Sequence, residues 1–446
     1  MRGPARRVAV VGSGIAGLSA AHTLAAPEHG CQVTLFEAGE HFGGHTHTVD
    51  VTLPGPGGVP VTHGVDTGFL VFNHRTYPGL VTLFGELDVA TAKSDMSFSV
   101  QVPDAGLEWS GSNLDSVFAQ RGNLLRPRFW RMLRELLRFN RLATELAEGG
   151  DEARLAQPIG DFLAAHGFGA EFRDWYFLPM LGCIWSCPTD QMLRFPVATM
   201  IRFCHNHGLL QVADRPQWYT VRGGARHYVH KLLRRVRDAR LATPVQRVRR
   251  LAGGVELRSS AGVEHFDAVV LACHSDQALA LLEDPSPDER AVLGAVRYQP
   301  NLAVLHTDTG LLPRRRRAWA AWNYERASND DRERSAVCLH YLLNRLQPLP
   351  FRQPVVVTLN PVREPAPATV LGRYDYAHPV FDAAAVEAQR RLPALQGRRA
   401  TWYCGAWTGY GFHEDGLQSG LAVARALIAS PLGAAPALAD VPRRVA

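Results

Sequence analysis

Lysine is almost absent from this chain. Only Lys93 and Lys231 occur in 446 residues, so 46 of the 48 basic residues are arginine. The arginines are spread along the chain and the formal net charge is only +6, which is typical of coding bias rather than of a nucleic-acid-binding surface. We therefore expect no nucleic-acid partner.

Cysteine patterns that bind metals or form redox pairs are also missing. The seven cysteines are odd in number and none forms a CxxC pair, which favours a reducing compartment. Cys183, Cys187 and the run Cys204-His205-Asn206-His207 do not have zinc-finger spacing. We expect no metal ion there, and His205 or His207 lining a substrate cavity is the better interpretation.

Long hydrophobic runs are the third absence. No apolar run is long enough to span a bilayer, and the opening residues MRGPARR lead into a strand without the apolar region of a signal peptide. These features predict a cytoplasmic protein. With 46% apolar residues, the chain can form two or three domains with large cores.

Residues 8–46 carry the strongest pattern that is present. An apolar run, Val8–Val11, meets Gly12-x-Gly14-x-x-Gly17, a helical pattern follows, and a second apolar run ends at Glu37. Gly12 permits a tight turn, Gly14 lets the backbone approach a pyrophosphate, and Gly17 lets the helix pack on the strand. The helix N-terminus attracts phosphates, and Glu37, 20 residues after Gly17, can accept hydrogen bonds from a ribose. The pattern predicts a dinucleotide-binding unit.

Related signals recur in the middle and at the end of the chain. A strand and a glycine turn are expected over 218–224, a buried parallel strand over 267–272, and a strand, glycine turn and helix over 401–428. Residues 112–215 have a mostly helical pattern. We predict an α/β fold in which a discontinuous Rossmann-like domain accompanies a second, α+β substrate domain. The predicted boundaries are 1–80, 216–290 and 395–432 for the first domain, 81–215 and 291–394 for the second, and 433–446 for a tail.

Further glycine motifs connect the chain to a known family. Gly43-Gly44-His45-Thr46 follows Glu37 closely, and Gly405 with a helix from about Gly416 closes the pattern. With these motifs the chain resembles the flavin-containing amine oxidase superfamily, which includes carotenoid desaturases and protoporphyrinogen oxidases. GCIWS at 182–186, NHGLL at 206–210 and RGGARHYV at 222–229 resemble bacterial proteins called predicted NAD/FAD-binding oxidoreductases. The resemblance implies an amine oxidase-like fold with FAD as the cofactor.

The resemblance also implies a role for each matching residue. The pyrophosphate would lie against Gly12, Ser13, Gly14, Ala16 and Gly17, and the adenosine ribose against Glu37 with its neighbour Ala38. Gly43, Gly44 and Thr46 would line the ribityl–pyrophosphate side, Gly68, Phe69 and Leu70 the isoalloxazine ring, and the backbone of Val245 the adenine. Gly405, Gly416 and Leu417 would place helix N–H groups near flavin N1 and O2, and Asp415 would cap that helix or bond the ribityl chain. The chain departs from the family at His45, where arginine is usual, and at Ala406, where an acid is frequent.

Two features bear on the chemistry. His413 stands three residues before Gly416, where relatives often have an aromatic residue facing the flavin, so it either moves protons near neutral pH or packs against the ring. Many amine oxidases of the superfamily carry a lysine that holds a water at flavin N5. Neither Lys93 nor Lys231 stands at that place, so amine oxidation is disfavoured.

The middle segment is rich in aromatic residues, which fits a helical core and also a pocket for a hydrophobic substrate. They include Trp175, Tyr176, Phe177, Trp185, Phe195 and Phe203. We expect an FAD-dependent oxidoreductase that abstracts hydride from a C–H bond of a lipid acyl chain or isoprenoid. Two alternatives stay open: a flavin-dependent isomerase or mutase without net redox change, and a non-catalytic flavin-binding partner protein.

A helix expected over 126–142 has two contrasting faces. One carries Arg131, Arg134, Arg138 and Arg141, and the other Phe129, Met132, Leu133 and Leu136. We favour an ordinary amphipathic helix packed on its own domain. The alternative is a helix that rests on the inner face of a membrane with anionic lipid. The Arg314–Arg317 run is expected to be a solvated loop.

Overall fold

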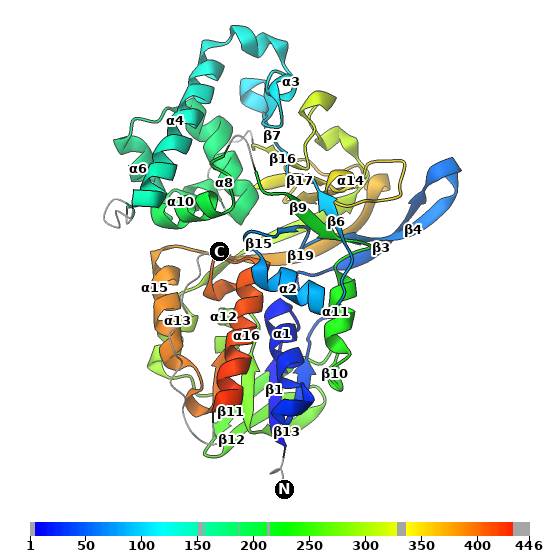
Figure 1. Ribbon diagram of the computed structural model, residues 1–446, viewed down its shortest axis with the longest axis vertical. Coiled ribbons are helices and arrows are strands. Elements are labelled where there is room, and N and C mark those ends of the chain that lie inside the picture. Colours follow the sequence, from blue (N-terminus) through cyan, green and yellow to red (C-terminus); the bar gives the residue numbers. More distant parts are fainter. Residues whose placement is uncertain are drawn as a thin grey trace.

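The structure is a computed structural model that describes residues 5–149, 155, 157–186, 188–211, 215–327 and 336–430. The predicted tail, 433–446, and Cys187 lie outside these residues. The chain forms two lobes, with a parallel sheet in the lower one and a second sheet and a group of helices in the upper one (Figure 1). Among the described helices, none combines the length and the apolar character that crossing a bilayer requires.

A five-stranded parallel sheet forms the centre of the lower lobe. Its order is β10 (Asp238–Arg240), β2 (Cys31–Phe36), β1 (Arg6–Val11), β14 (Ala268–Leu271) and β20 (Thr401–Tyr403). Every neighbouring pair is parallel, so three distant parts of the sequence lie side by side. The predicted α/β fold with a discontinuous Rossmann-like sheet is therefore confirmed, while the residue limits of the two domains stay a prediction.

Both faces of this sheet are covered, which explains its continuous apolar runs. Val8 and Val10 share one core with α1 (Ile15–Leu24) and α16 (His413–Ala429), and α11 (Arg226–Leu233) and α2 (Pro78–Glu86) extend that layer. Ala9 and Val11 face a separate core on the other side. That side is built from β11 (Val245–Leu251), β12 (Gly254–Ser259), β13 (Gly262–Phe266), α12 (Ser275–Leu281), α13 (Pro287–Leu293) and α15 (Ala383–Arg391).

The upper lobe contains a seven-stranded mixed sheet. Its order is β19 (Val370–Val380), β15 (Arg297–His306), β18 (Val356–Leu359), β17 (Cys338–Leu342), β16 (Trp322–Glu325), β7 (Phe98–Val102) and β8 (Leu107–Ser110). A short helix, α14 (Leu343–Leu346), directly follows β17 in the chain. Two small sheets join the lobes or project from them: the hairpin β3 (Thr48–Pro54) with β4 (Pro60–Asp66), and the group β5 (Phe72–Asn73), β9 (Trp218–Val221) and β6 (Thr91–Ser94). The hairpin extends away from the body of the molecule (Figure 1).

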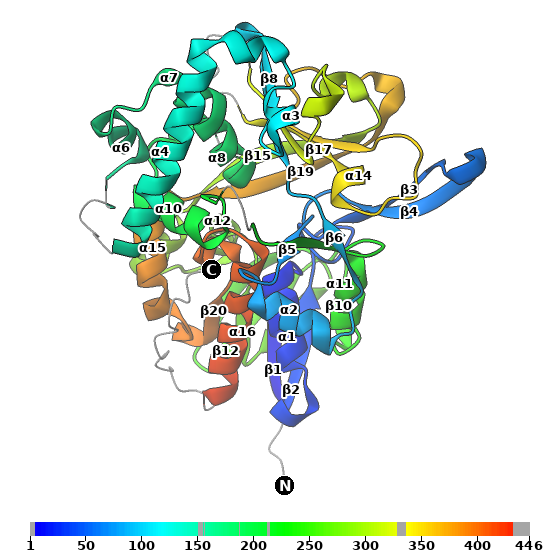
Figure 2. The same cartoon turned by 45° about the horizontal axis from the view of Figure 1, so that its top comes forward.

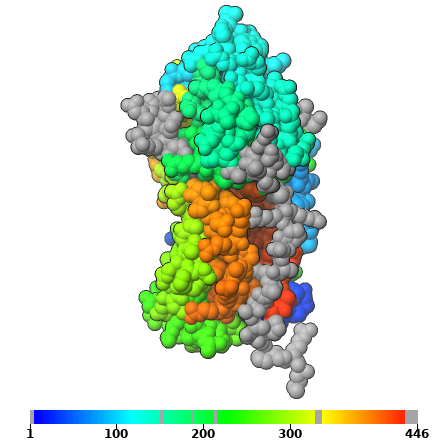
Figure 3. Space-filling model, turned by 90° about the vertical axis from the view of Figure 1, so that its left-hand side faces the viewer, coloured from blue at the N-terminus to red at the C-terminus, as the bar shows by residue number. Residues whose placement is uncertain are grey.

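Helices cover one side of the upper lobe, as predicted for residues 112–215. They are α3 (Leu114–Val117), α4 (Pro127–Gly149), α6 (Ile159–Ala165), α7 (Ala170–Phe172), α8 (Leu178–Trp185), α9 (Thr189–Met192) and α10 (Val197–Asn206). Figure 2 shows α4, α8 and α10 grouped beside the strands, and Figure 3 shows this region in cyan and green above α15.

Helix α4 packs on its own lobe, which was the favoured expectation. Phe129 and Met132 have no exposed surface, because they belong to the core of that lobe, while membrane contact by this helix stays a prediction. Arg131 lies 3.8 Å from Glu171, and the Arg138 guanidinium lies 4.1 Å from the ring centroid of Phe168. Two arginines of this face therefore make contacts within the upper lobe.

Candidate active site

A cavity of about 1620 Å³ runs from the carboxyl end of the parallel sheet into the upper lobe. The predicted site residues that line it are Gly12, Ser13, Gly14, Ala16, Glu37, Ala38, Gly43, Gly44, His45, Gly68, Phe69, Leu70, Val245, Gly405, Ala406 and His413. Gly17, Thr46, Asp415, Gly416 and Leu417 do not line it. The structure thus brings five segments of the sequence to one space, although contacts with a cofactor stay a prediction for every one of these residues.

The three glycines of the first turn have different physical roles. Gly12 has a φ of +101°, and a Cβ there would lie 3.0 Å from the carbonyl oxygen of Ala272. A Cβ on Gly17 would lie 1.9 Å from the Gly12 carbonyl oxygen, so Gly17 allows α1 to pack on the turn. A Cβ on Gly14 would have no neighbour within 4 Å. The fold therefore needs Gly12 and Gly17, whereas Gly14 borders open space.

Glu37 connects the first turn to the segment that follows β2. Its Oε2 accepts hydrogen bonds from the Ser13 backbone N–H, at 2.9 Å, and from the Ser13 hydroxyl. Ser13 Oγ also accepts a hydrogen bond of 3.1 Å from the Gly43 backbone N–H. A Cβ on Gly44 would lie 3.1 Å from Gly14 Cα, so the second glycine pair crosses directly beside the first turn.

His45 is a half-buried side chain that lines the cavity and whose Nε2 atom is buried. Its Nε2 has no hydrogen-bond partner in the described part of the chain. His378 and Tyr376 lie beside it, with ring centroids at 5.2 Å and 5.1 Å, and His274 is 6.5 Å away. Burial, together with the neighbouring histidines, holds the pKa of His45 well below its usual range. A buried ring nitrogen without a hydrogen-bond partner is the feature expected where a polar ligand completes the site.

A dinucleotide fits these residues. Gly14 leaves room for a phosphate to approach the backbone closely. Because the N-cap residue of α1 is this glycine, no side chain caps the N–H groups of the first helical turn. The helix N–H groups at that end therefore suit phosphate oxygens. The buried Nε2 of His45 adds a hydrogen-bonding group on the same loop that crosses Gly14.

The final helix begins at His413, three residues earlier than predicted. Asp415 stabilises this start because its Oδ2 accepts hydrogen bonds from the backbone N–H groups of Phe412, at 2.9 Å, and Tyr410, at 3.1 Å. A Cβ on Gly416 would lie 2.8 Å from the Ile15 side chain, and one on Gly420 would lie 2.1 Å from the Ala16 carbonyl oxygen. These two glycines therefore let α16 pack closely on α1, behind the cavity wall.

His413 is held as a neutral ring. It stacks on Phe69 with ring centroids 3.8 Å apart, and its Nε2 lies 2.6 Å from the Tyr228 hydroxyl and 3.3 Å from Thr46 Oγ1. Burial lowers the pKa of His413 to about 3 and raises the pKa of the Tyr228 phenol. Nε2 and the Tyr228 hydroxyl therefore share a hydrogen bond between two neutral groups, and His413 presents an uncharged surface to the cavity.

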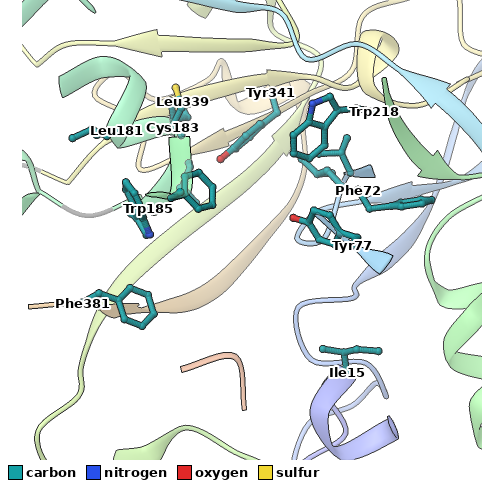
Figure 4. Packing of buried hydrophobic residues seen from close by; sticks show 14 of the residues in the cluster. Ile15, Phe72, Tyr77, Leu181, Cys183, Trp185, Trp218, Leu339, Tyr341 and Phe381 are labelled. Carbon is teal, nitrogen blue, oxygen red and sulfur yellow. The ribbon is translucent and has the colours of Figure 1, made fainter. Parts of the chain in front are cut away.

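The part of the cavity in the upper lobe is mostly aromatic and aliphatic. Figure 4 shows that Trp185, Trp218, Tyr341 and Phe381 come from different elements and surround one space above Ile15. His207 also lines the cavity, whereas His205 does not. Neither lysine lines it: Lys231 Nζ donates to the Leu87 carbonyl oxygen at 2.7 Å, and Lys93 is exposed on β6.

Sequence analysis missed Tyr228, His274, Tyr376 and His378. Tyr376 and His378 alternate along β19, and this period of two was a signal that they share one face of a strand. Tyr228 and His274 have no comparable local signal. His274 lines the cavity just after β14, whereas Tyr228, on α11, lies behind the cavity wall and contacts His413. Cys183 and Cys204 are buried free thiols, and the described residues that could together hold a metal are a different group, Glu325, Cys338 and His340.

A parallel sheet with this glycine turn, joined through one cavity to a second lobe, is typical of dinucleotide-dependent enzymes. The chain belongs to the family of flavin-containing amine oxidoreductases, whose family model matches residues 15–348. The chain accordingly has the amine oxidase fold, and the family implies FAD as the cofactor.

Individual relatives show how far this similarity extends. A carotenoid phi-ring synthase from Streptomyces griseus is 30% identical over 330 residues, which cover 68% of this chain and 58% of that protein. The match thus spans less than two thirds of the relative's length. A fatty acid isomerase from P. acnes that produces CLA has a TM-score of 0.65 at 16% identity, covering 94% of this chain and 98% of the isomerase. Cyclohexylamine oxidase from Brevibacterium oxydans has a TM-score of 0.66 at 16% identity, covering 95% and 99%. These two solved structures therefore have the same fold as this chain.

Proposed function

We propose that this enzyme removes a hydride from a C–H bond of a hydrophobic small molecule, a lipid acyl chain or an isoprenoid, rather than from an amine. The observation that carries this proposal is the cavity of about 1620 Å³, whose upper part is walled by aromatic side chains and lacks lysine. Such a wall favours a long apolar substrate. The names of two similar proteins, a carotenoid phi-ring synthase and a fatty acid isomerase, support the same substrate classes.

The residues that would hold FAD follow from the geometry of the lower lobe. Gly14 and the first turn of α1 would receive the pyrophosphate, and Glu37 the ribose. His45 would form a hydrogen bond through Nε2, and the stacked pair Phe69–His413 would form a wall close to the reacting ring. When bound, FAD supplies a hydride acceptor. His413, with Nε2 hydrogen-bonded to the Tyr228 hydroxyl, would exclude water and orient the substrate without adding charge.

The experiment is anaerobic reduction of the purified flavoprotein. Unsaturated fatty acyl lipids and polyenes are expected to bleach the flavin absorbance, and primary amines such as putrescine and cyclohexylamine are not. Fast bleaching by an amine, with no response to any lipid or polyene, would contradict the proposal. A protein that neither contains FAD nor binds added FAD would contradict it at an earlier step.

An isomerase without net redox change is the second candidate, favoured by the similarity to the fatty acid isomerase fold. Mass spectrometry of the product separates the two reactions. Desaturation lowers the mass of the substrate by two hydrogens, whereas isomerisation leaves it unchanged and moves only the position or geometry of a double bond.

A further inference from the structure

Large apolar side chains are exposed together at one tip of the helical region. Of the eleven exposed large hydrophobic residues in the described chain, five belong to this tip. They are Leu114, Leu124, Leu125, Trp130 and Leu137, with 77%, 47%, 89%, 49% and 55% of their surface exposed. We call these five residues the Leu–Trp patch. Scattered single apolar residues are normal on a surface, but such a cluster marks a site of interaction.

The patch is continuous in space. The Trp130 indole N–H donates a 2.9 Å hydrogen bond to the Leu124 carbonyl oxygen, and the Trp130 ring lies 5.3 Å from that of Phe118. Leu114 stands one helical turn before Phe118, and Leu137 two turns after Trp130 on the same face of α4. Three elements, α3, the short helix η4 (Arg121–Leu125) and α4, therefore contribute to one apolar surface.

The patch is also where the cavity reaches the surface. Leu114, Trp130 and Leu137 are exposed and at the same time line the cavity. Leu133 and Leu136 of α4 continue the apolar lining inward. A hydrocarbon chain can thus pass from the patch to the interior along a path of apolar side chains.

Positive charge surrounds the apolar centre. Arg121, Arg126 and Arg134 are exposed on η4, before α4 and on α4. The Arg314–Arg317 run, predicted as a solvated loop, adjoins α3, because Arg317 lies 3.5 Å from Asp115. Asp115 also pairs with Arg121, so this acid is already neutralised. Apolar anchors within a rim of arginines are complementary to a bilayer that contains anionic lipid.

We propose that the Leu–Trp patch docks on an anionic bilayer and that the substrate is a membrane lipid whose hydrocarbon chain enters the cavity there. The statement about the substrate rests on the proposed function, while docking does not. This surface is distinct from the buried face of α4, where Phe129 and Met132 point into the protein.

The test is sedimentation of the FAD-loaded full chain with vesicles. Vesicles of phosphatidylcholine with roughly 30% phosphatidylglycerol are expected to bind the protein, more strongly than phosphatidylcholine alone and less strongly as salt rises. The double variant Leu124→Asn with Leu125→Asn should weaken binding by about tenfold or more, because two inserted side chains become polar. Both residues are exposed and neither lines the cavity, so FAD content should be unchanged.

The matched control is Val263→Asn, an exposed apolar residue on β13 in the lower lobe, whose variant should bind vesicles like the unchanged protein. A fluorescent label on Leu125→Cys should shift to the blue with vesicles, and a label on Val263→Cys should not. Equal binding by the patch variant and the control variant, or a patch variant that instead abolishes self-association in light scattering, would overturn the proposal.

Failure of docking and failure of the proposed function are distinguishable. If vesicles bind through the patch but no lipid bleaches the flavin, docking stands and the proposed reaction is wrong. If lipid in detergent bleaches the flavin but the protein does not bind vesicles, the reaction stands and docking is wrong.

Discussion

Replacing Gly14 by valine separates cofactor binding from folding. The backbone of Gly14 has φ −61° and ψ 175°, which valine adopts without strain, and a Cβ there has no neighbour within 4 Å. The apoprotein should therefore fold normally. It should even gain up to about 1 kcal/mol, because losing a glycine restricts the unfolded chain.

FAD binding should respond in the opposite direction. The valine side chain would occupy the space at the N-terminus of α1 that the pyrophosphate needs. Each hydrogen bond to a charged group contributes roughly 1.5–3 kcal/mol. Losing one or two of them should weaken the binding of FAD by about 3 kcal/mol, which is a factor of about 150 in Kd. Fluorescence titration of the apoprotein measures the Kd, and thermal unfolding with and without FAD measures the lost stabilisation.

Gly17→Ala is the matched comparison. Its Cβ would lie 1.9 Å from the Gly12 carbonyl oxygen, so this smaller substitution should destabilise the apoprotein by about 2 kcal/mol or more. The reasoning is refuted if Gly14→Val binds FAD as tightly as the unchanged protein, or if its apoprotein is less stable than that of Gly17→Ala.

Three other predictions follow from buried polar groups. Tyr228→Phe keeps the ring but leaves His413 Nε2 without its hydrogen-bond partner at 2.6 Å, so urea unfolding should show a loss of about 1–3 kcal/mol. His45→Ala removes the unpaired Nε2 at the cavity and should weaken the binding of FAD about tenfold in the fluorescence titration, while His45→Arg should leave the binding of FAD unweakened. Burial raises the pKa of Asp415 to about 7, above its value in the unfolded chain, so the folded apoprotein retains the proton. The stabilisation contributed by this carboxyl should be complete below about pH 4 and should fall by about 1.4 kcal/mol per pH unit as the pH rises to about 7. Asp415→Asn should flatten that part of the profile measured by urea unfolding.

Local patterns made much of the lower lobe predictable. The apolar runs at β1, β2 and β14 are buried on both faces, and the glycine spacing marks the turn that follows β1. The position of α16 was less accurate. Gly416 was placed at the flavin from the motif, but the helix begins at His413 and Gly416 packs on Ile15.

Long-range packing set the limit for the rest. Tyr228, His274 and His378 lie on α11, after β14 and on β19, and no sequence period connects these elements. On α4 the arginine and apolar faces were recognised, yet periodicity could not tell which apolar residues face the core. Phe129 is buried and its neighbour Trp130 is exposed, because the cavity and the core lie on different sides of the helix.

The charges in the cavity restrict which C–H bonds the enzyme can use. Among the described residues that line it, the carboxylates are Glu37 and Asp95. The Glu37 carboxylate accepts hydrogen bonds from the Ser13 and Gly39 backbone N–H groups. The Asp95 carboxylate accepts a hydrogen bond from the Ser97 backbone N–H and forms an ion pair with Arg345. Loss of hydride leaves positive charge on carbon, and the neutral His413 supplies no anion to balance it. Under the proposed function, we therefore expect a substrate that can delocalise this charge, as at a carbon next to an existing double bond, which an unsaturated acyl chain or a polyene has and a saturated chain lacks. Desaturation would also need an acceptor for the proton lost from the neighbouring carbon, whereas isomerisation would return the hydride to the substrate.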